Sequence, residues 1–127
     1  MRVMMSKKAR RQRRQMHLAP WHRKRKMMSV HLSEEYLGDS KKTYPRAVPV
    51  RKGDTVKVMR GKDTGFEGKV SSTDTKSMTI MIEGLTRNKA DGTQIGKKIH
   101  PSNVLITKLD LSDPIRREKI EALRDRK

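Results

Sequence analysis

No acidic side chain occurs in the first 33 residues of this chain; the first is Glu34. Basic side chains crowd the same stretch, including Lys7, Lys8 and the run Arg23 to Lys26. A segment with one sign of charge and few apolar residues cannot bury enough surface to fold alone, so we expect it to be disordered in isolation. Such an arm can order on RNA by threading into grooves that a globular surface cannot enter.

The remaining charge is less one-sided. Residues 1–46 carry 14 Lys and Arg against 3 acids, residues 47–111 carry 12 against 7, and residues 112–127 carry 6 against 4. We interpret these as a basic N-terminal extension, a folded body and a C-terminal tail. The formal net charge of +18 indicates a polyanionic partner, because neutralising many cations on nucleic acid releases counterions.

Composition limits the other functions that the chain can have. Only 32% of the 127 residues are hydrophobic and 3% are aromatic, which predicts a small core. The chain has no cysteine, so disulfides, thiolate zinc sites and cysteine nucleophiles are excluded. No apolar run has the length of a signal peptide or a membrane span, and the cytoplasm is the expected location.

Apolar residues and a helix signal interrupt the basic arm. Val30 and Leu32 precede Ser33, Glu34 and Glu35, which predict a helix N-cap with acids in the first turn and an end near Gly38. The alternative for a basic run is a solvated tail or a localisation signal. Local structure in the arm argues against that alternative.

Alternating residues and regular turns begin after Pro49. Thr55–Val58 and 68–71 predict two strands of a hairpin, and the denser run 78–82 predicts a central or doubly buried strand. Asp91-Gly92 predicts a tight turn, and 104–106 a last strand. About five short strands favour a mainly β fold with a small closed antiparallel barrel, because closure hides the sheet edges.

The tail predicts a short helix. Asp113 is the expected N-cap and Pro114 the first helical residue, while Ile115, Ile120 and Leu123 form a weak apolar stripe. We expect this helix to pack lightly or to fray.

The stretch 50–70 resembles the KOW motif. Gly53-Asp54 turns the chain into a strand, and Val56, Val58 and Val70 are expected to face a core. The turn glycines of the motif, where positive φ or close backbone approach is needed, are Gly53, Gly61, Gly65 and Gly68. KOW motifs occur in ribosomal proteins and in transcription elongation factors.

Three further blocks, 19–33, 89–93 and 99–104, are similar to the archaeal form of the universal large-subunit ribosomal protein family numbered twenty-four, to which eukaryotic large-subunit protein twenty-six is related. The resemblance implies an SH3-like barrel that binds large-subunit rRNA near its 5′ end, acts early in subunit assembly and lies near the exit of the nascent-chain tunnel. The partners that the resemblance implies are this rRNA, neighbouring ribosomal proteins and factors at the tunnel exit. We expect neither membrane insertion nor homo-oligomers.

The candidate rRNA-binding side chains are cations, histidines and one tryptophan. They are Lys7, Lys8, Arg10, Arg11, Arg13, Arg14, Trp21, His22, Arg23, Lys24, Arg25, Lys26, His31, Arg51, Lys52, Lys57, Arg60, Lys62, Lys69, Lys89 and His100. Trp21 and Phe66 lie among cations, where a ring either stacks on an unpaired base or packs in the protein. Met78 and Met81 are expected in the core.

Other site chemistries fit poorly. His17, His22 and His31 are spaced by five and nine residues among cations without cysteine, so no metal or other cofactor is expected. Gly61-Lys62 lacks the spacing of a phosphate-binding loop. Acids such as Asp54 and Asp63 are expected to be salt-bridged or solvated, so the chain is not predicted to be an enzyme.

Two rival functions use similar residues. A transcription or translation factor outside the ribosome would share the KOW motif but present a transient apolar partner surface. An architectural DNA-binding protein would bind duplex DNA and structured rRNA with comparable affinity at one salt concentration.

Overall fold

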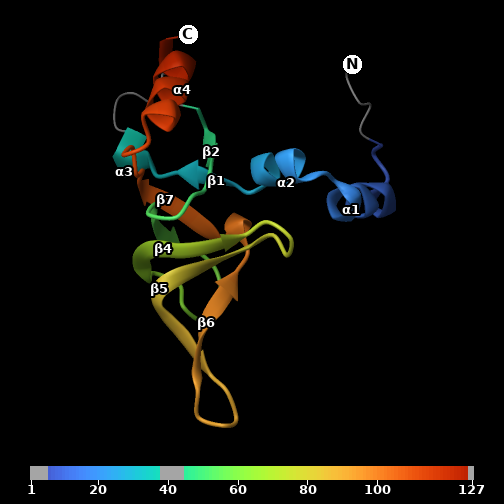
Figure 1. Cartoon of the computed structure of the whole chain (residues 1–127), viewed down its shortest axis with the longest axis vertical. Coiled ribbons are helices and arrows are strands. Elements are labelled where there is room, and N and C mark those ends of the chain that lie inside the picture. Colours follow the sequence, from blue (N-terminus) through green and yellow to red (C-terminus); the bar gives the residue numbers. More distant parts are fainter. Residues whose placement is uncertain (1–5, 38–44, 126–127) are drawn as a thin grey trace.

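The computed structural model describes residues 6–37 and 45–125 and is mainly β (Figure 1). Its seven strands form one sheet in the order β2-β1-β7-β3-β4-β5-β6. The strands are β1 Ser29–Leu32, β2 Ala47–Pro49, β3 Thr55–Val58, β4 Glu67–Asp74, β5 Thr79–Asn88, β6 Gln94–Ile99 and β7 Val104–Lys108. The helices are α1 Ala9–Leu18, α2 Trp21–Met27, α3 Glu34–Leu37 and α4 Pro114–Asp125, with a 3-10 turn at Pro101–Asn103.

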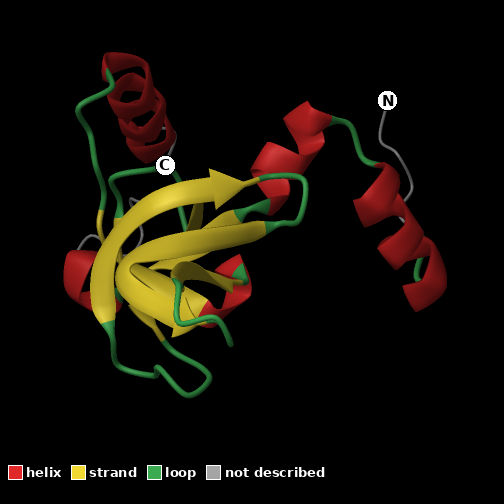
Figure 2. Cartoon of the chain, turned by 60° about the horizontal axis from the view of Figure 1, so that its bottom comes forward, coloured by secondary structure: helices red, strands yellow, loops and turns green. Residues whose placement is uncertain are grey.

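The sheet is curved but is not a closed barrel (Figure 2). Within residues 6–37 and 45–125, no pairing joins the outer strands β2 and β6, so the predicted closure is not confirmed. The sheet is also mixed, because β1 runs parallel to β7 while the other pairs are antiparallel. The prediction of a wholly antiparallel sheet of about five strands was therefore wrong in the direction of one strand pair and in the number of strands.

The extra strands have an identifiable source. β1 comes from the segment assigned to the arm, where Val30 and Leu32 alternate with polar neighbours and are buried in the sheet. β2 pairs with β1 through Val48 opposite Val30. The apolar residues Val30 and Leu32 that interrupt the basic run are thus core residues, and with Met28 they anchor this segment to the body.

The strands predicted in the body are confirmed. Val56, Val58 and Val70 are buried as expected of the motif. The predicted strand at 78–82 begins β5, where the side chains alternate between buried and half-buried. Met78 lies in the core, whereas Met81 is half-buried over Gly96 of β6.

The turns also follow the sequence. The Asp91-Gly92 turn joins β5 to β6, with Gly92 at φ +87° and the Lys89 N–H donating to the Thr93 carbonyl at 2.8 Å. Ser33 caps α3 by accepting from the Tyr36 N–H at 3.1 Å. Gly38 lies outside the described residues.

The C-terminal helix lies where it was predicted and packs lightly, but only Ile120 of its predicted apolar stripe is buried. Asp113 caps it, accepting from the Ile115 N–H at 3.0 Å, and Pro114 is its first residue. Ile120 is 6% exposed and Arg116 is 5% exposed, so α4 is docked through these two residues. Ile115 and Leu123 are exposed, and the expected apolar stripe does not form.

The first two helices lie outside the sheet. α1 has no buried residue and sits far from the strands, with α2 between them (Figure 1). α2 contacts β2. Among the described residues, no helix is long and apolar enough to cross a membrane.

Candidate nucleic-acid interface

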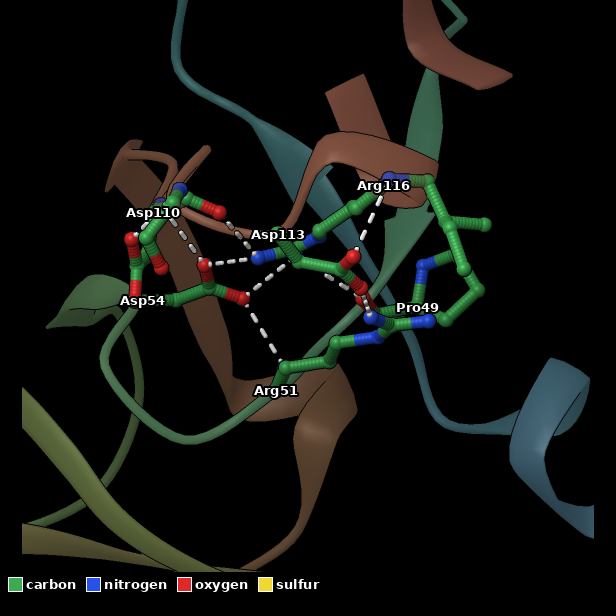
Figure 3. A network of polar contacts seen from close by, with 8 residues as sticks. Pro49, Arg51, Asp54, Asp110, Asp113 and Arg116 are labelled. Carbon is green, nitrogen blue, oxygen red and sulfur yellow. Dashed lines mark hydrogen bonds and ion pairs between the residues drawn. The ribbon is translucent and has the colours of Figure 1, made fainter. Parts of the chain in front are cut away.

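A buried ion pair fixes the loop that joins β2 to β3. Arg116 of α4 donates from Nη1 to Asp54 Oδ1 at 2.5 Å and from Nη2 to Asp54 Oδ2 at 2.7 Å (Figure 3). Asp54 also accepts from the backbone N–H groups of Arg51 at 2.8 Å and Asp110 at 3.0 Å. Each oxygen of this fully buried carboxylate therefore meets two donors, as a buried charge requires.

The same guanidinium binds the start of the loop. Arg116 Nη2 donates to the Pro49 carbonyl at 3.2 Å, and Nη1 donates to the Asp110 carbonyl at 2.8 Å. At the edge of this network, Arg51 donates to Asp113 at 2.6 Å. This hydrogen bond lowers the pKa of the partly exposed Asp113 carboxyl. The expectation that Asp54 is salt-bridged is confirmed.

Glycine at position 53 is required by the tight turn before β3. Gly53 has φ +96°, and a Cβ there would lie 2.5 Å from Asp110 Oδ2. Gly68 is needed for a different reason, because its Cβ would lie 2.8 Å from Ile82 Cγ2 on β5. Of the other motif glycines, Gly61 and Gly65 have positive φ.

α2 is held against this loop by the start of the sheet. The Val50 N–H donates to the Met28 carbonyl at 3.1 Å, and both side chains are buried. Met28 directly follows α2, so the helix that carries His22 to Lys26 is attached to a rigid point of the body.

The arm and the motif meet at a cationic hollow of about 590 Å³. α2 contributes His22, Arg25 and Lys26, while the loop contributes Arg51 and Lys52. The other lining residues are Met28, Pro49, Val50, Thr73, Thr75 and Lys119. None of the lining residues is acidic, so the hollow, termed here the cationic hollow, is suited to an anion.

A second hollow of about 540 Å³ lies within the arm. Arg11 and Arg14 of α1 and Arg23 of α2 are its cationic lining residues. The rest of its lining is Ser6, Gln15, Leu18, Ala19 and Pro20. It too has no acidic lining residue.

The remaining predicted cations are spread over the surface. Lys57, Arg60, Lys62, Lys69 and Lys89 are exposed on or beside the strands and line neither hollow. The remaining arm cations, Lys7, Lys8, Arg10, Arg13 and Lys24, line neither hollow either.

Ion pairing separates two groups of basic residues. Among the described residues, the ion pairs are Arg51–Asp113, Lys97–Asp63, Lys98–Asp74 and Arg116–Asp54. Arg51 alone of the predicted interface cations belongs to this set. The others have no acidic partner within residues 6–36 and 45–123, which leaves them available to phosphate.

The predicted histidines are not gathered at one site. His22 lines the cationic hollow, but the His31 Nδ1 lies 3.4 Å from the Arg46 carbonyl. His100 caps the 3-10 turn, its Nδ1 accepting from the Ser102 N–H at 3.2 Å. In the described part of the chain, no group of three potential metal-ligating side chains occurs.

The two aromatic candidates differ in their surroundings. Trp21 is 62% exposed at the start of α2. The Phe66 ring instead covers backbone, because Cβ atoms on Gly68 and Gly84 would each lie 3.1 Å from it. Trp21 is thus the more exposed of the two rings, at 62% against 36% for Phe66.

Lys119 was not among the residues predicted from the sequence. This exposed residue of α4 lines the cationic hollow, 67 positions after Lys52. A Lys in an amphipathic helix is ordinarily a solvated residue. The docking of α4 through Arg116 and Ile120 brings Lys119 to the arm.

A small mainly β body with cationic hollows and unpaired exposed cations is typical of a nucleic-acid-binding protein. Residues 6–123 match the family described as the eukaryotic ribosomal proteins L26 and their archaeal L24 counterparts, and the chain belongs to this family. It is accordingly a structural ribosomal protein and not an enzyme.

Relatives named large ribosomal subunit protein uL24 match over most of their length. The protein of Methanothrix thermoacetophila is 49% identical over 92% of this chain and 97% of its own. The protein of Saccharolobus solfataricus is 46% identical over 93% and 97%. The protein of Korarchaeum cryptofilum is 47% identical over 91% and 86%. The resemblance drawn from the sequence is therefore confirmed.

Proposed function

We propose that this chain is a structural constituent of the large ribosomal subunit and binds large-subunit rRNA directly. The cationic hollow carries this proposal, because it joins the basic arm to the KOW loop in one concave surface without acidic residues. Family membership supplies the ribosomal context. The chain works in the cytoplasm as part of that subunit, beside neighbouring ribosomal proteins.

The family resemblance supports a binding position on the rRNA and a division of the chain into three parts. We propose that binding takes place near the 5′ end of the rRNA, early in assembly, and close to the tunnel exit, where nascent-chain factors are possible partners. We propose residues 47–111 as an SH3-like unit to which β1 adds a strand, residues 1–46 as the extension, whose part before Met28 threads into the rRNA, and residues 112–127 as the C-terminal helix.

Phosphate contacts supply most of the binding free energy in this proposal. Arg25, Lys26 and Lys52 contact backbone phosphates at the hollow, and the arm cations outside it contact neighbouring RNA segments. The exposed ring of Trp21 stacks on an unpaired base. These contacts fix position rather than read base sequence.

Footprinting tests the target and its position together. The full chain is bound to isolated archaeal large-subunit rRNA at fixed salt, with small-subunit rRNA as the control. Protection confined to the 5′ region of the large-subunit rRNA is expected. Protection elsewhere would exclude the 5′ assignment.

A KOW factor outside the ribosome is the alternative. Co-sedimentation separates the two functions, because a subunit constituent stays with large subunits in high salt whereas a transient factor dissociates. Recovery of the chain only in the soluble fraction would favour the alternative.

A further inference from the structure

α4 forms one side of the cationic hollow. Lys119 lines it from this helix, together with residues of α2 and the β2–β3 loop. Lys119 is exposed and has no ion pair with another residue of the described chain, while Arg116, one turn earlier, is buried. The residue that anchors α4 and the cation that reaches the hollow thus belong to one short helix.

Arg116 also holds both ends of the segment that carries Arg51 and Lys52. Its guanidinium donates to the Pro49 carbonyl before them and to the Asp54 carboxylate after them. Asp54 in turn accepts the Arg51 N–H. Because a guanidinium and a carboxylate pair in a planar, directional fork, this contact fixes the loop as well as the helix (Figure 3).

The lining chemistry identifies the occupant. Arginine and lysine residues line the hollow together with the hydroxyl residues Thr73 and Thr75, and no lining residue is acidic. Such groups are the ones that bind phosphate oxygens and sugars in nucleic-acid complexes. A volume of about 590 Å³ is in the range of pockets for small ligands, so it admits only a short stretch of backbone.

We propose that the cationic hollow binds consecutive phosphates of the rRNA backbone, with Lys119 as a direct phosphate ligand and Asp54 and Arg116 as the positioning residues that build the hollow. This inference rests on the proposed function and assigns α4 a place in the interface. It makes the arm, the KOW loop and α4 a single binding unit.

A matched pair of charge removals tests the phosphate ligand. Lys119→Gln and Arg87→Gln each remove one exposed positive charge, but Arg87 on β5 does not line the hollow. The full chain is bound to transcribed archaeal large-subunit rRNA over a series of KCl concentrations. Compared with the wild-type chain, the slope of log K against log [KCl] should be shallower by about one in Lys119→Gln and should change less in Arg87→Gln. Equal slopes in the two variants overturn the proposal.

Two variants test the positioning residues independently of charge. Arg116→Lys keeps the net charge, and Asp54→Asn raises it by one, so charge alone predicts an equal or a steeper slope. Loss of the bidentate Arg116–Asp54 contact predicts a shallower slope in both variants, because phosphate contacts at the cationic hollow are lost. Circular dichroism verifies that the variants are folded, and a folded variant with an unchanged or steeper slope refutes the positioning role. If both unfold, the Lys119→Gln and Arg87→Gln pair decides the proposal alone.

The wild-type chain separates this inference from the proposed function. It should prefer large-subunit rRNA to small-subunit rRNA at one salt concentration. Equal binding of the two RNAs overturns the proposed function. If the chain prefers large-subunit rRNA but Lys119→Gln and Arg87→Gln have equal slopes, the proposed function stands and only the phosphate site at the cationic hollow is overturned.

Discussion

Arg116 and Asp54 form a bidentate ion pair across 62 residues of sequence, with the carboxylate fully buried. The pair joins the last helix to the turn that begins the KOW motif. Asp54 alone satisfies two backbone N–H groups of different loops. The contact therefore organises the C-terminal part of the chain and one edge of the interface together.

Breaking this pair from one side should destabilise the fold strongly. Arg116→Ala leaves a buried carboxylate without its counter-charge, which costs about 3–5 kcal/mol of unfolding free energy. Urea denaturation followed by circular dichroism measures the loss. Lys119→Ala on the exposed side of the same helix should change stability by about 0.5 kcal/mol or less. Similar losses in the two variants would show that the pair is not a major stabilising contact.

Two glycine substitutions separate backbone strain from steric clash. Gly61→Ala puts a Cβ at φ +101° in open space, and the left-handed conformation costs about 1–2 kcal/mol. Gly53→Ala has comparable strain at φ +96° and also places its Cβ against Asp110. Its unfolding free energy should fall further than that of Gly61→Ala. An equal fall would mean that the Asp110 side chain moves aside without cost.

Asp74 should make stability dependent on pH in the acid range. The Ser77 hydroxyl, and then the Ser77 and Lys76 N–H groups, lower its pKa below the ordinary 3.8 in the folded state. The unfolded state then binds the proton more readily, so this contribution is present above pH 3.8 and is lost as pH falls through the lowered pKa.

The Ser77 hydroxyl can be removed to test that cause. In Ser77→Ala, the pKa of Asp74 should rise toward its ordinary value, because the strongest hydrogen bond to the carboxylate is gone. Carboxyl titration by NMR measures it in both proteins. Identical titration curves would rule out the Ser77 side chain as the cause.

Deleting the arm should reduce the salt dependence of rRNA binding. Removal of residues 6–27 keeps Met28, Val30 and Leu32, which belong to the core, so the body should stay folded. Fewer neutralised phosphates give a clearly shallower slope of log K against log salt. A slope equal to that of the full chain would mean that the arm does not contact phosphate.

Trp21 and Phe66 should respond differently to truncation. Trp21→Ala should leave stability unchanged and weaken rRNA binding by about 1–3 kcal/mol, as for loss of one stacked base. Phe66→Ala should instead lower the unfolding free energy by about 0.5–3 kcal/mol, because its ring covers Gly68 and Gly84. Binding titrations and denaturation of both variants test this contrast. Loss of stability in Trp21→Ala together with loss of binding in Phe66→Ala would contradict it.

Much of the body could be predicted because its signals are local. The alternation of Thr55–Val58, the glycines of the motif and the Asp91-Gly92 turn each specify backbone conformation within a few residues. The strand β1 was missed because its apolar residues follow a basic run directly. Its parallel partner β7 lies more than 70 positions away, and short-range periodicity contains no information about that pairing.

The sequence alone determined the basic arm, the KOW motif and the family, because the positions of charged residues and the spacing of a motif are read directly from the order of amino acids. The assembly of the interface was decided only by the tertiary structure. Lys119, Lys52 and Lys26 meet at one hollow because Arg116 binds Asp54 and because Met28 anchors α2 to the sheet. Contacts between residues so distant in sequence arise from burial and the pairing of buried charges, which no local pattern encodes.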